Sequence, residues 1–395
     1  MFGAHVTVKS GYEMPFDDDA ILHVADGRVS VDSPQQAFDF DFLDIEDVVA
    51  ENFELMATLA DGRLVTFSAL GRQYEEFVYG FQNGWRAEIL RHLLPTGATA
   101  YKTFECSYKY ESPVGHQHEC EAANIALYPD GLVAVPESAE LLHYFYHDVT
   151  NTYFDAELFT AKISFTDGSA LTLRRLAKRY SEFQLALEHL IYKLAETTTA
   201  GLKSLLPDFP ESGFYRLAKK MGAGLAVNAR TVEGSARGLW LPLESAVCSS
   251  DVRRFHFEHL KALAEENGVY LGIRFAGAKG PPVTWFLVAS PARKALFAEV
   301  TSGARNDTYV FHLDPGGYEG QVLDLNRALL LLNFEAEALA ADDRMLRGKE
   351  LRKFRPATRK LPVVAAARKR FAAKIAHTSD DGWAGGLVAA LSKLK

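Results

Sequence analysis

Residues 59–77 read LADGRLVTFSALGRQYEEF, and residues 165–183 repeat the pattern as FTDGSALTLRRLAKRYSEF. In each stretch a Tyr lies 13 positions after the Asp of an Asp-Gly pair, and a Phe follows three positions later. The shared landmarks are Asp26-Gly27, Asp61-Gly62, Tyr74 and Phe77 in the first copy, and Asp130-Gly131, Asp167-Gly168, Tyr180 and Phe183 in the second. Their common order and spacing indicate a duplication of about a hundred residues.

Each copy predicts a run of antiparallel strands followed by a helix. The Asp-Gly pairs lie between short runs rich in Val, Leu, Ile and Phe, which is typical of hairpins whose Gly tolerates a positive φ. The stretch AFDFDFLDIEDV (37–48) alternates Phe with Asp, as in a strand with one buried face. In EFQLALEHLIYKLAE (182–196) apolar residues recur at helical spacing, and Phe77, Phe81, Trp85 and Ile89 follow the same spacing in the first copy.

This layout resembles the pleckstrin-homology-like (PH-like) family, which includes bacterial PH-like and GRAM-like domains. The resemblance lies in FDFLDIEDVVAENFELMATLADGRLVTFSALGRQYEEFVYGF (40–81) and in YFYHDVTNTYFDAELFTAKISFTDGSALTL (144–173). It implies a mainly β fold with α-helices, in which each bent sheet is closed by a C-terminal helix. The expected domains are residues 1–97 and 101–197.

Residues 213–340 are open to two interpretations, a third and degraded PH-like copy or a different domain. After a linker-like stretch (195–213), strands are expected at GLWLPL, GVYLGIRF, VTWFLVAS, ALFAEV and TYVFHL. A helix is expected at DVRRFHFEHLKALAEENG, and another at VLDLNRALLLLNFEAEALAADD closes the segment. No Asp-Gly landmark recurs at the earlier spacing.

Charge separates the body of the chain from its end. The first 343 residues carry 29 basic and 48 acidic side chains, whereas residues 344–395 carry 14 basic and three acidic ones. We expect 344–395 to form a basic helical tail, with an amphipathic helix over VVAAARKRFAAKIA (363–376). The candidate electrostatic binding residues of the tail are Arg352, Lys353, Arg355, Arg359, Lys360, Arg368, Lys369, Arg370 and Lys374.

A secondary basic cluster lies within the repeats and is a second candidate for electrostatic binding. The competing interpretation is a solvated face at the start of a helix. It consists of Arg174, Arg175, Lys178 and Arg179. In the PH-like family, lipid binding depends on basic residues of the first hairpin. Here that hairpin carries only Arg28 in the first copy and none in the second, which argues against phosphoinositide binding.

The stretch CSYKYESPVGHQHEC (106–120) offers a weak metal-site candidate. Its two Cys and two His are ligands that zinc accepts in a tetrahedral site, namely Cys106, His116, His118 and Cys120. Structural zinc sites place their ligands in closer pairs, so an ordinary hairpin loop is the favoured interpretation. No cofactor motif and no catalytic grouping is recognisable in the sequence.

These observations predict a non-enzymatic interaction or scaffold protein with a protein partner. Three Cys, no long apolar run and no signal-peptide pattern favour a cytoplasmic location. One alternative is peripheral attachment to an anionic membrane through the tail. Another is an enzyme with a site in residues 215–330. Aromatic residues are sparse in the tail, so nucleic acid is the least favoured partner.

Overall fold

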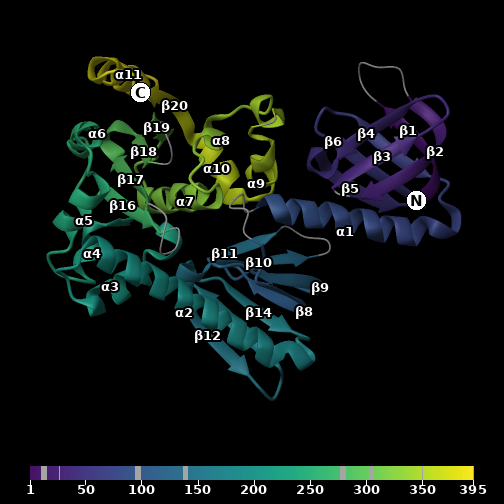
Figure 1. Ribbon diagram of the computed structural model, residues 1–395, viewed down its shortest axis with the longest axis horizontal. Helices are drawn as coiled ribbons and strands as arrows, with labels where there is room; N and C mark the ends of the chain where they lie inside the picture. Colours follow the sequence, from purple (N-terminus) through teal and green to yellow (C-terminus); the bar gives the residue numbers. More distant parts are fainter. Residues whose placement is uncertain are drawn as a thin grey trace. The chain divides into compact units, whose positions relative to one another are not determined.

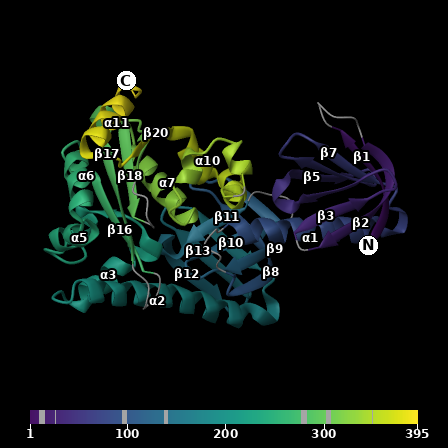
Figure 2. The same cartoon turned by 45° about the horizontal axis from the view of Figure 1, so that its top comes forward.

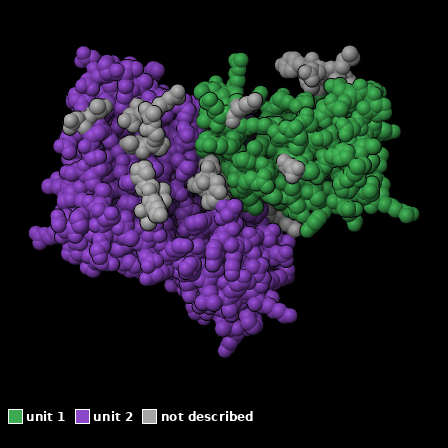
Figure 3. All heavy atoms as spheres, in the orientation of Figure 1, with its two compact units in different colours: residues 1–97, 342–357 green, residues 98–341, 358–395 purple. Residues whose placement is uncertain are grey.

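The computed structural model describes residues 1–9, 16–25, 27–93, 99–136, 141–275, 282–301, 307–348 and 350–394. Asp26, one landmark of the repeat, lies outside the described residues. The chain forms two compact units, residues 1–97 with 342–357 and residues 98–341 with 358–395 (Figure 3). No helix in the described ranges is both long and apolar enough to cross a membrane.

The first copy folds as a seven-stranded antiparallel sheet with the order β4-β3-β2-β1-β7-β6-β5. Its strands are β1 (Phe2–Lys9), β2 (Phe16–Ala25), β3 (Arg28–Asp32), β4 (Ala37–Asp41), β5 (Ile45–Glu51), β6 (Glu54–Leu59) and β7 (Leu64–Ser68). Two 3-10 helices, η1 (Phe42–Asp44) and η2 (Gly71–Gln73), precede β5 and the closing helix α1 (Tyr74–Leu93).

The second copy has the same order, β11-β10-β9-β8-β14-β13-β12. Its strands are β8 (Lys102–Glu111), β9 (Gln117–Leu127), β10 (Gly131–Pro136), β11 (Leu142–Phe145), β12 (Val149–Asp155), β13 (Thr160–Phe165) and β14 (Ala170–Arg174). The 3-10 helices η3 (Tyr146–Asp148) and η4 (Ala177–Arg179) and the helix α2 (Tyr180–Leu205) occupy the positions of η1, η2 and α1. The predicted mixture of mainly β structure with helices is confirmed.

Backbone details also repeat between the two copies. Gly62 and Gly168 have φ values of 89° and 86° in equivalent Asp-Gly turns, as the hairpin pattern predicts. Before each closing helix a non-glycine residue takes a positive φ at the same place, 54° at Ala69 and 61° at Arg175. Shared turns of this kind allow residue-by-residue comparison of the copies.

The two closing helices bury their apolar faces in the cores of their sheets. Phe77 and Phe81 pack against Phe67, with ring centroids 5.4 and 5.7 Å away. The helix α2 is longer than its counterpart and runs beside the second sheet in Figures 1 and 2. Its first part contributes Phe183 to the second core, while Leu202 near its end is buried in the core of a third sheet.

The third sheet is a six-stranded antiparallel meander with the order β15-β16-β17-β18-β19-β20, so it does not repeat the strand order of the first two. Its strands are β15 (Val227–Asn228), β16 (Val269–Arg274), β17 (Val283–Ser290), β18 (Ala295–Thr301), β19 (Asp307–His312) and β20 (Phe371–Ala376). The helices that precede, connect or follow these strands are α3 (Glu211–Ala218), η5 (Gly222–Gly224), α4 (Ala229–Glu233), α5 (Trp240–Val247), α6 (Asp251–Lys261), η6 (Pro291–Arg293), α7 (Tyr318–Leu331), α8 (Glu337–Ala340), α10 (Pro362–Arg370) and α11 (Asp380–Ser392). Between α8 and α10 lie η7 (Met345–Arg347), η8 (Arg352–Phe354) and α9 (Arg355–Lys360).

Three local predictions were wrong. The linker-like stretch after residue 195 continues α2 to Leu205, because Thr199 and Leu202 are buried. The expected strand GLWLPL belongs largely to α5. The expected helix over 363–376 ends at Arg370, and the following residues pair with β19 as an edge strand. In each case burial against distant parts of the chain overrides the local pattern.

Candidate functional site

A short 3-10 helix precedes the fifth strand of each copy and ends in an aspartate. Phe42 donates its backbone N–H to Gly27 O (2.8 Å), and Tyr146 donates to Asp130 O (3.0 Å), so each 3-10 helix lies against the turn between the second and third strands of its copy. The carbonyls of Asp44 and Asp148 accept from Ala60 and Thr166, both at 2.8 Å. Asp44 and Asp148 therefore occupy equivalent positions. We define the acidic corner of the first copy as Asp41, Asp44 and Glu46, and that of the second copy as Asp130 and Asp148.

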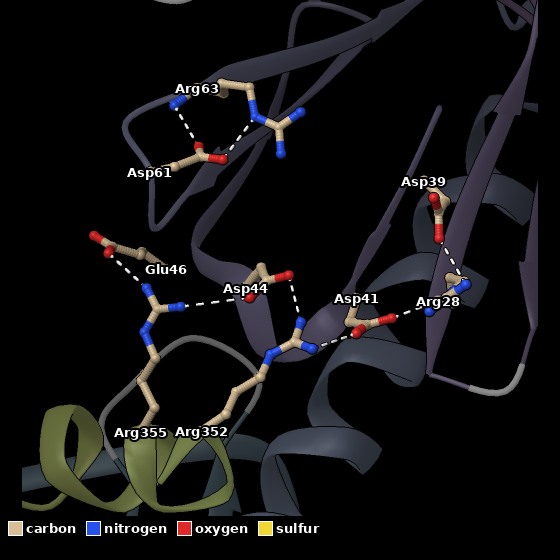
Figure 4. A network of polar contacts seen from close by, with 9 residues as sticks. All are labelled: Arg28, Asp39, Asp41, Asp44, Glu46, Asp61, Arg63, Arg352 and Arg355. Carbon is tan, nitrogen blue, oxygen red and sulfur yellow. Dashed lines mark hydrogen bonds and ion pairs between the residues drawn. The ribbon is translucent and has the colours of Figure 1, made fainter. Parts of the chain in front are cut away.

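The acidic corner of the first copy binds two arginines from η8 and α9 (Figure 4). Arg352 pairs with Asp41 (2.7 Å) and with Asp44. Arg355 donates to Glu46 (2.9 Å) and lies 3.6 Å from Asp44. The Arg355 side chain is 3% exposed, whereas the three carboxylates stay about one-quarter to one-third exposed. The first corner is thus a partly open set of charge-assisted contacts.

The acidic corner of the second copy also binds two arginines, and they come from the third sheet and from α7. Arg327 donates to Asp148 (2.6 Å), whose side chain is only 6% exposed. Arg274 of β16 pairs with Asp130 at 3.4 Å. Burial is the main cause that raises the pKa of Asp130, and Arg274 opposes this rise. These contacts join the second copy to the third sheet within one compact unit.

Two histidines lie beside the corner of the second copy. His147 follows Tyr146 within η3, and its ring stacks on Phe145 at a centroid distance of 5.0 Å. The pKa of His143 falls to about 4, mainly through burial, with smaller lowering contributions from His147 and Arg327. Both imidazoles are therefore neutral near pH 7.

The other candidate residues of the basic segment are also engaged within the chain. Lys374 of β20 pairs with Asp307 (3.1 Å) and Glu337 (2.6 Å), and Arg368 donates to Ala341 O (2.7 Å). The ammonium of Lys353 lies 4.8 Å from the centre of the Phe354 ring. Arg359 and Lys360 belong to α9, and Lys369 and Arg370 end α10. Residues 344–395 are thus built into both units, and the expectation of a helical tail is wrong for 371–376.

The secondary basic cluster lies just before α2, and three of its four side chains contact carboxylates. Arg174 and Arg175 lie near Glu119 (3.9 Å) and Glu121 (2.6 Å) of β9. Arg179 pairs with Glu182 (3.0 Å) and donates to Thr103 O (2.9 Å), while Lys178 is exposed in η4. The hairpin that carries Arg28 joins β2 and β3 and follows the hairpin of β1 and β2, so the expectation that it is the first hairpin was wrong. Arg28 pairs with Asp39 (2.6 Å) and Asp41 (3.0 Å).

The four residues of the weak metal candidate do not form a ligand group in the described structure. Cys106 and Cys120 are buried in the second core, whereas His116 and His118 are exposed. Burial is the main cause that raises the pKa of the Cys106 thiol to about 12, so the thiolate that binds metal is disfavoured.

A different cluster of potential metal ligands lies at the third sheet, at His256 of α6, Glu299 of β18 and His377 after β20. One potential ligand atom from each of these three described residues lies within 4.8 Å of the other two. Burial raises the pKa of Glu299 to about 7, lowers that of His377 to about 4, and lowers that of His256. The sequence gives no motif for it, because 121 residues separate the two histidines.

Comparison with known protein families and with curated proteins finds no match to this chain.

Proposed function

We propose that this chain is a non-enzymatic, cytoplasmic interaction or scaffold protein built on two PH-like domains, which bind arginine-bearing segments of proteins at their acidic corners. The observation that carries the proposal is the use of one position, Asp44 in the first copy and Asp148 in the second, to bind arginines from later parts of the chain. Two copies with the same strand order and a closing helix support the PH-like assignment.

The first corner is better suited to a partner than the second. Its carboxylates remain partly exposed, and its arginines come from η8 and α9, two short elements outside the sheet. A partner segment with arginines at similar spacing would have to replace these two arginines together with the buried contacts of residues 354–358. Contacts of one guanidinium to two carboxylates, as Arg352 makes to Asp41 and Asp44, would give such binding its orientation.

Attachment to an anionic membrane has weaker support. Arg352, Arg355 and Lys374 of the basic segment are paired with carboxylates of the chain itself. Binding to lipid headgroups would require these pairs to break. Arg28 of the β2–β3 hairpin is likewise paired, which argues against a phosphoinositide site there.

The test uses full-length protein with Arg352→Ala and Arg355→Ala together, and a fluorescent peptide that spans residues 350–360 (ELRKFRPATRK). We expect the peptide to bind this double variant, measured by fluorescence anisotropy. Binding to the wild type should be weaker, because the wild-type segment competes at a high effective concentration.

The matched controls remove one negative charge inside or outside the corner. Adding Asp44→Asn to the double variant should weaken peptide binding about 5-fold, the equivalent of about 1 kcal/mol. Adding Asp39→Asn, which removes a carboxylate bound to Arg28, should have little effect. Equal affinity of the two triple variants, or no binding to the double variant, would contradict the proposal. Co-sedimentation of the wild type with phosphatidylserine vesicles would instead favour the membrane alternative.

A further inference from the structure

The cluster of His256, Glu299 and His377 brings together residues from three separate elements. Helix α6 supplies His256, strand β18 supplies Glu299, and His377 follows β20. His256 and Glu299 are each 1% exposed, and the His377 side chain is 6% exposed. The two imidazole rings lie 3.9 Å apart between centroids. Three potential ligands are thus held in a closed site inside one compact unit.

Several polar atoms of the cluster lack a hydrogen-bond partner in the described structure. They are Nδ1 of His256, Nδ1 of His377 and Oε1 of Glu299, all inaccessible to solvent. A buried polar atom without a partner destabilises the fold, and such atoms are uncommon in native structures. A cation that coordinates the cluster would satisfy part of this requirement.

Surrounding contacts orient the ligands. The Trp383 indole donates to Thr308 Oγ1 (2.9 Å), which lies 2.8 Å from His377 Nε2 and donates to Glu299 Oε2 (3.2 Å). Thr308 of β19 is the cross-strand neighbour of Glu299 and of Ile375. Hydrogen bonds around metal ligands commonly set ligand orientation and metal affinity. Arg253 adds positive charge near Glu299, which reduces the affinity for a cation.

We propose that His256, Glu299 and His377 bind one divalent transition-metal ion, with zinc as the best match. Two imidazoles and one carboxylate are a ligand set that zinc accepts, and a closed site suits a structural ion. Zinc at about 2.1 Å from each ligand would place the ligand atoms about 3.4 Å apart. The cluster, with ligand atoms within 4.8 Å, would therefore contract on binding. The ion would link His377 to α6 and β18 through its bonds to His256 and Glu299.

The test uses the full-length wild type after dialysis against a chelator. Isothermal titration with Zn²⁺ should show one bound ion per chain, and the thermal midpoint should rise as Zn²⁺ is added. Titration with Co²⁺ should give visible absorption bands of a four- or five-coordinate ion. A folded wild type that binds no stoichiometric ion would overturn the proposal.

Two ligand variants and one control assign the site. Glu299→Gln keeps the size of the side chain, and His377→Gln removes one imidazole. Each should weaken Zn²⁺ binding by at least about 100-fold, since even residues around the ligands commonly change affinity 10- to 100-fold. The control is His259→Gln, on the same helix as His256, whose Nδ1 contacts Phe255 O at 2.8 Å. Undiminished binding by the ligand variants, or equal loss in the control, would refute the assignment. Circular dichroism verifies that each variant is folded.

Discussion

Asp44 and Asp148 occupy the same position in the two copies but differ in burial, and this predicts unequal effects of one substitution. Asp148→Asn leaves Arg327 with reduced charge compensation in a buried setting, so we expect a loss of about 3 kcal/mol in unfolding free energy. Asp44→Asn should cost about 1 kcal/mol or less, because Arg352 keeps Asp41 and Arg355 keeps Glu46. Urea unfolding, with hydrogen exchange as the probe of each copy, measures the loss of unfolding free energy in both variants. Equal losses would contradict the prediction made from the difference in burial.

The buried His143 predicts that acid destabilises the second copy. Its folded-state pKa is about 4 and its unfolded value is 6.5, so the unfolded state binds the proton more readily between these values. Unfolding free energy should therefore fall as pH drops from 6.5 towards 4, by at most about 3 kcal/mol. His147, whose pKa burial also lowers, adds a change of the same sign.

The variant His143→Gln should flatten this pH dependence, measured as urea unfolding midpoints between pH 7 and pH 4. The opposing charge of Asp148 and the like charge of Arg327 remain in place in this variant. The control is His116→Gln, in an exposed loop of the same unit. If the variant kept the full slope of the wild type, protonation of His143 would not be its cause.

At the level of residues, part of the site was accessible from sequence. Asp44 and Asp148 fall at the same place when FLDIEDV and YHDVTNT are aligned, and that shared acidic residue is a signal for the corner. The arginine partners of the first corner were among the tail candidates, but their targets were not predictable because about 300 residues separate them from the first copy. The partners of the second corner, Arg274 and Arg327, were missed altogether. The buried cluster of His256, Glu299 and His377 has no recognisable motif in the sequence, since each potential ligand comes from a different part of the chain.

Among the elements, β20 departs most from its sequence pattern. The stretch FAAKIA is rich in Ala and follows a helix, so local propensity predicts that the helix continues. Pairing with β19 and burial of Ile375 favour the strand instead. The strands of the two repeats were predictable because hairpin turns and alternation are local signals, whereas the partner of β20 lies about 60 residues earlier.

The one buried side chain of the edge strand β20 predicts a specific loss of stability on its truncation. Ile375 is 5% exposed and packs in the third core, so Ile375→Ala should lower the unfolding free energy by about 2–4 kcal/mol. Val388→Ala on α11 is the control, because Val388 is exposed and its substitution should change stability by less than about 0.5 kcal/mol. Chemical denaturation measures both. If neither substitution changed the unfolding free energy, Ile375 would belong to a solvated helical tail and not to a packed strand.

Over the whole molecule, the basic charge of residues 344–395 is distributed between the two units instead of forming a separate appendage. Residues 342–357 belong to the first unit, and residues 358–395 belong to the second. Part of the acidic excess of the first 343 residues is thus compensated inside the fold, at the first acidic corner and around Lys374. Sequence composition indicated the charge separation, while only the contacts show where each charge is used.

This arrangement predicts that deletion of residues 344–395 damages both units. The first unit would lose Phe354 and the arginines of its corner, and the second would lose β20 together with the buried Trp383. Hydrogen exchange should therefore become faster in both copies and in the third sheet. The control variant, Lys369→Gln with Lys393→Gln, removes two exposed positive charges and keeps every buried contact, so it should exchange like the wild type. Unchanged exchange in residues 1–93 and 99–341 of the truncated protein would mean that 344–395 is a detachable tail, and its charges would then be available to an external partner.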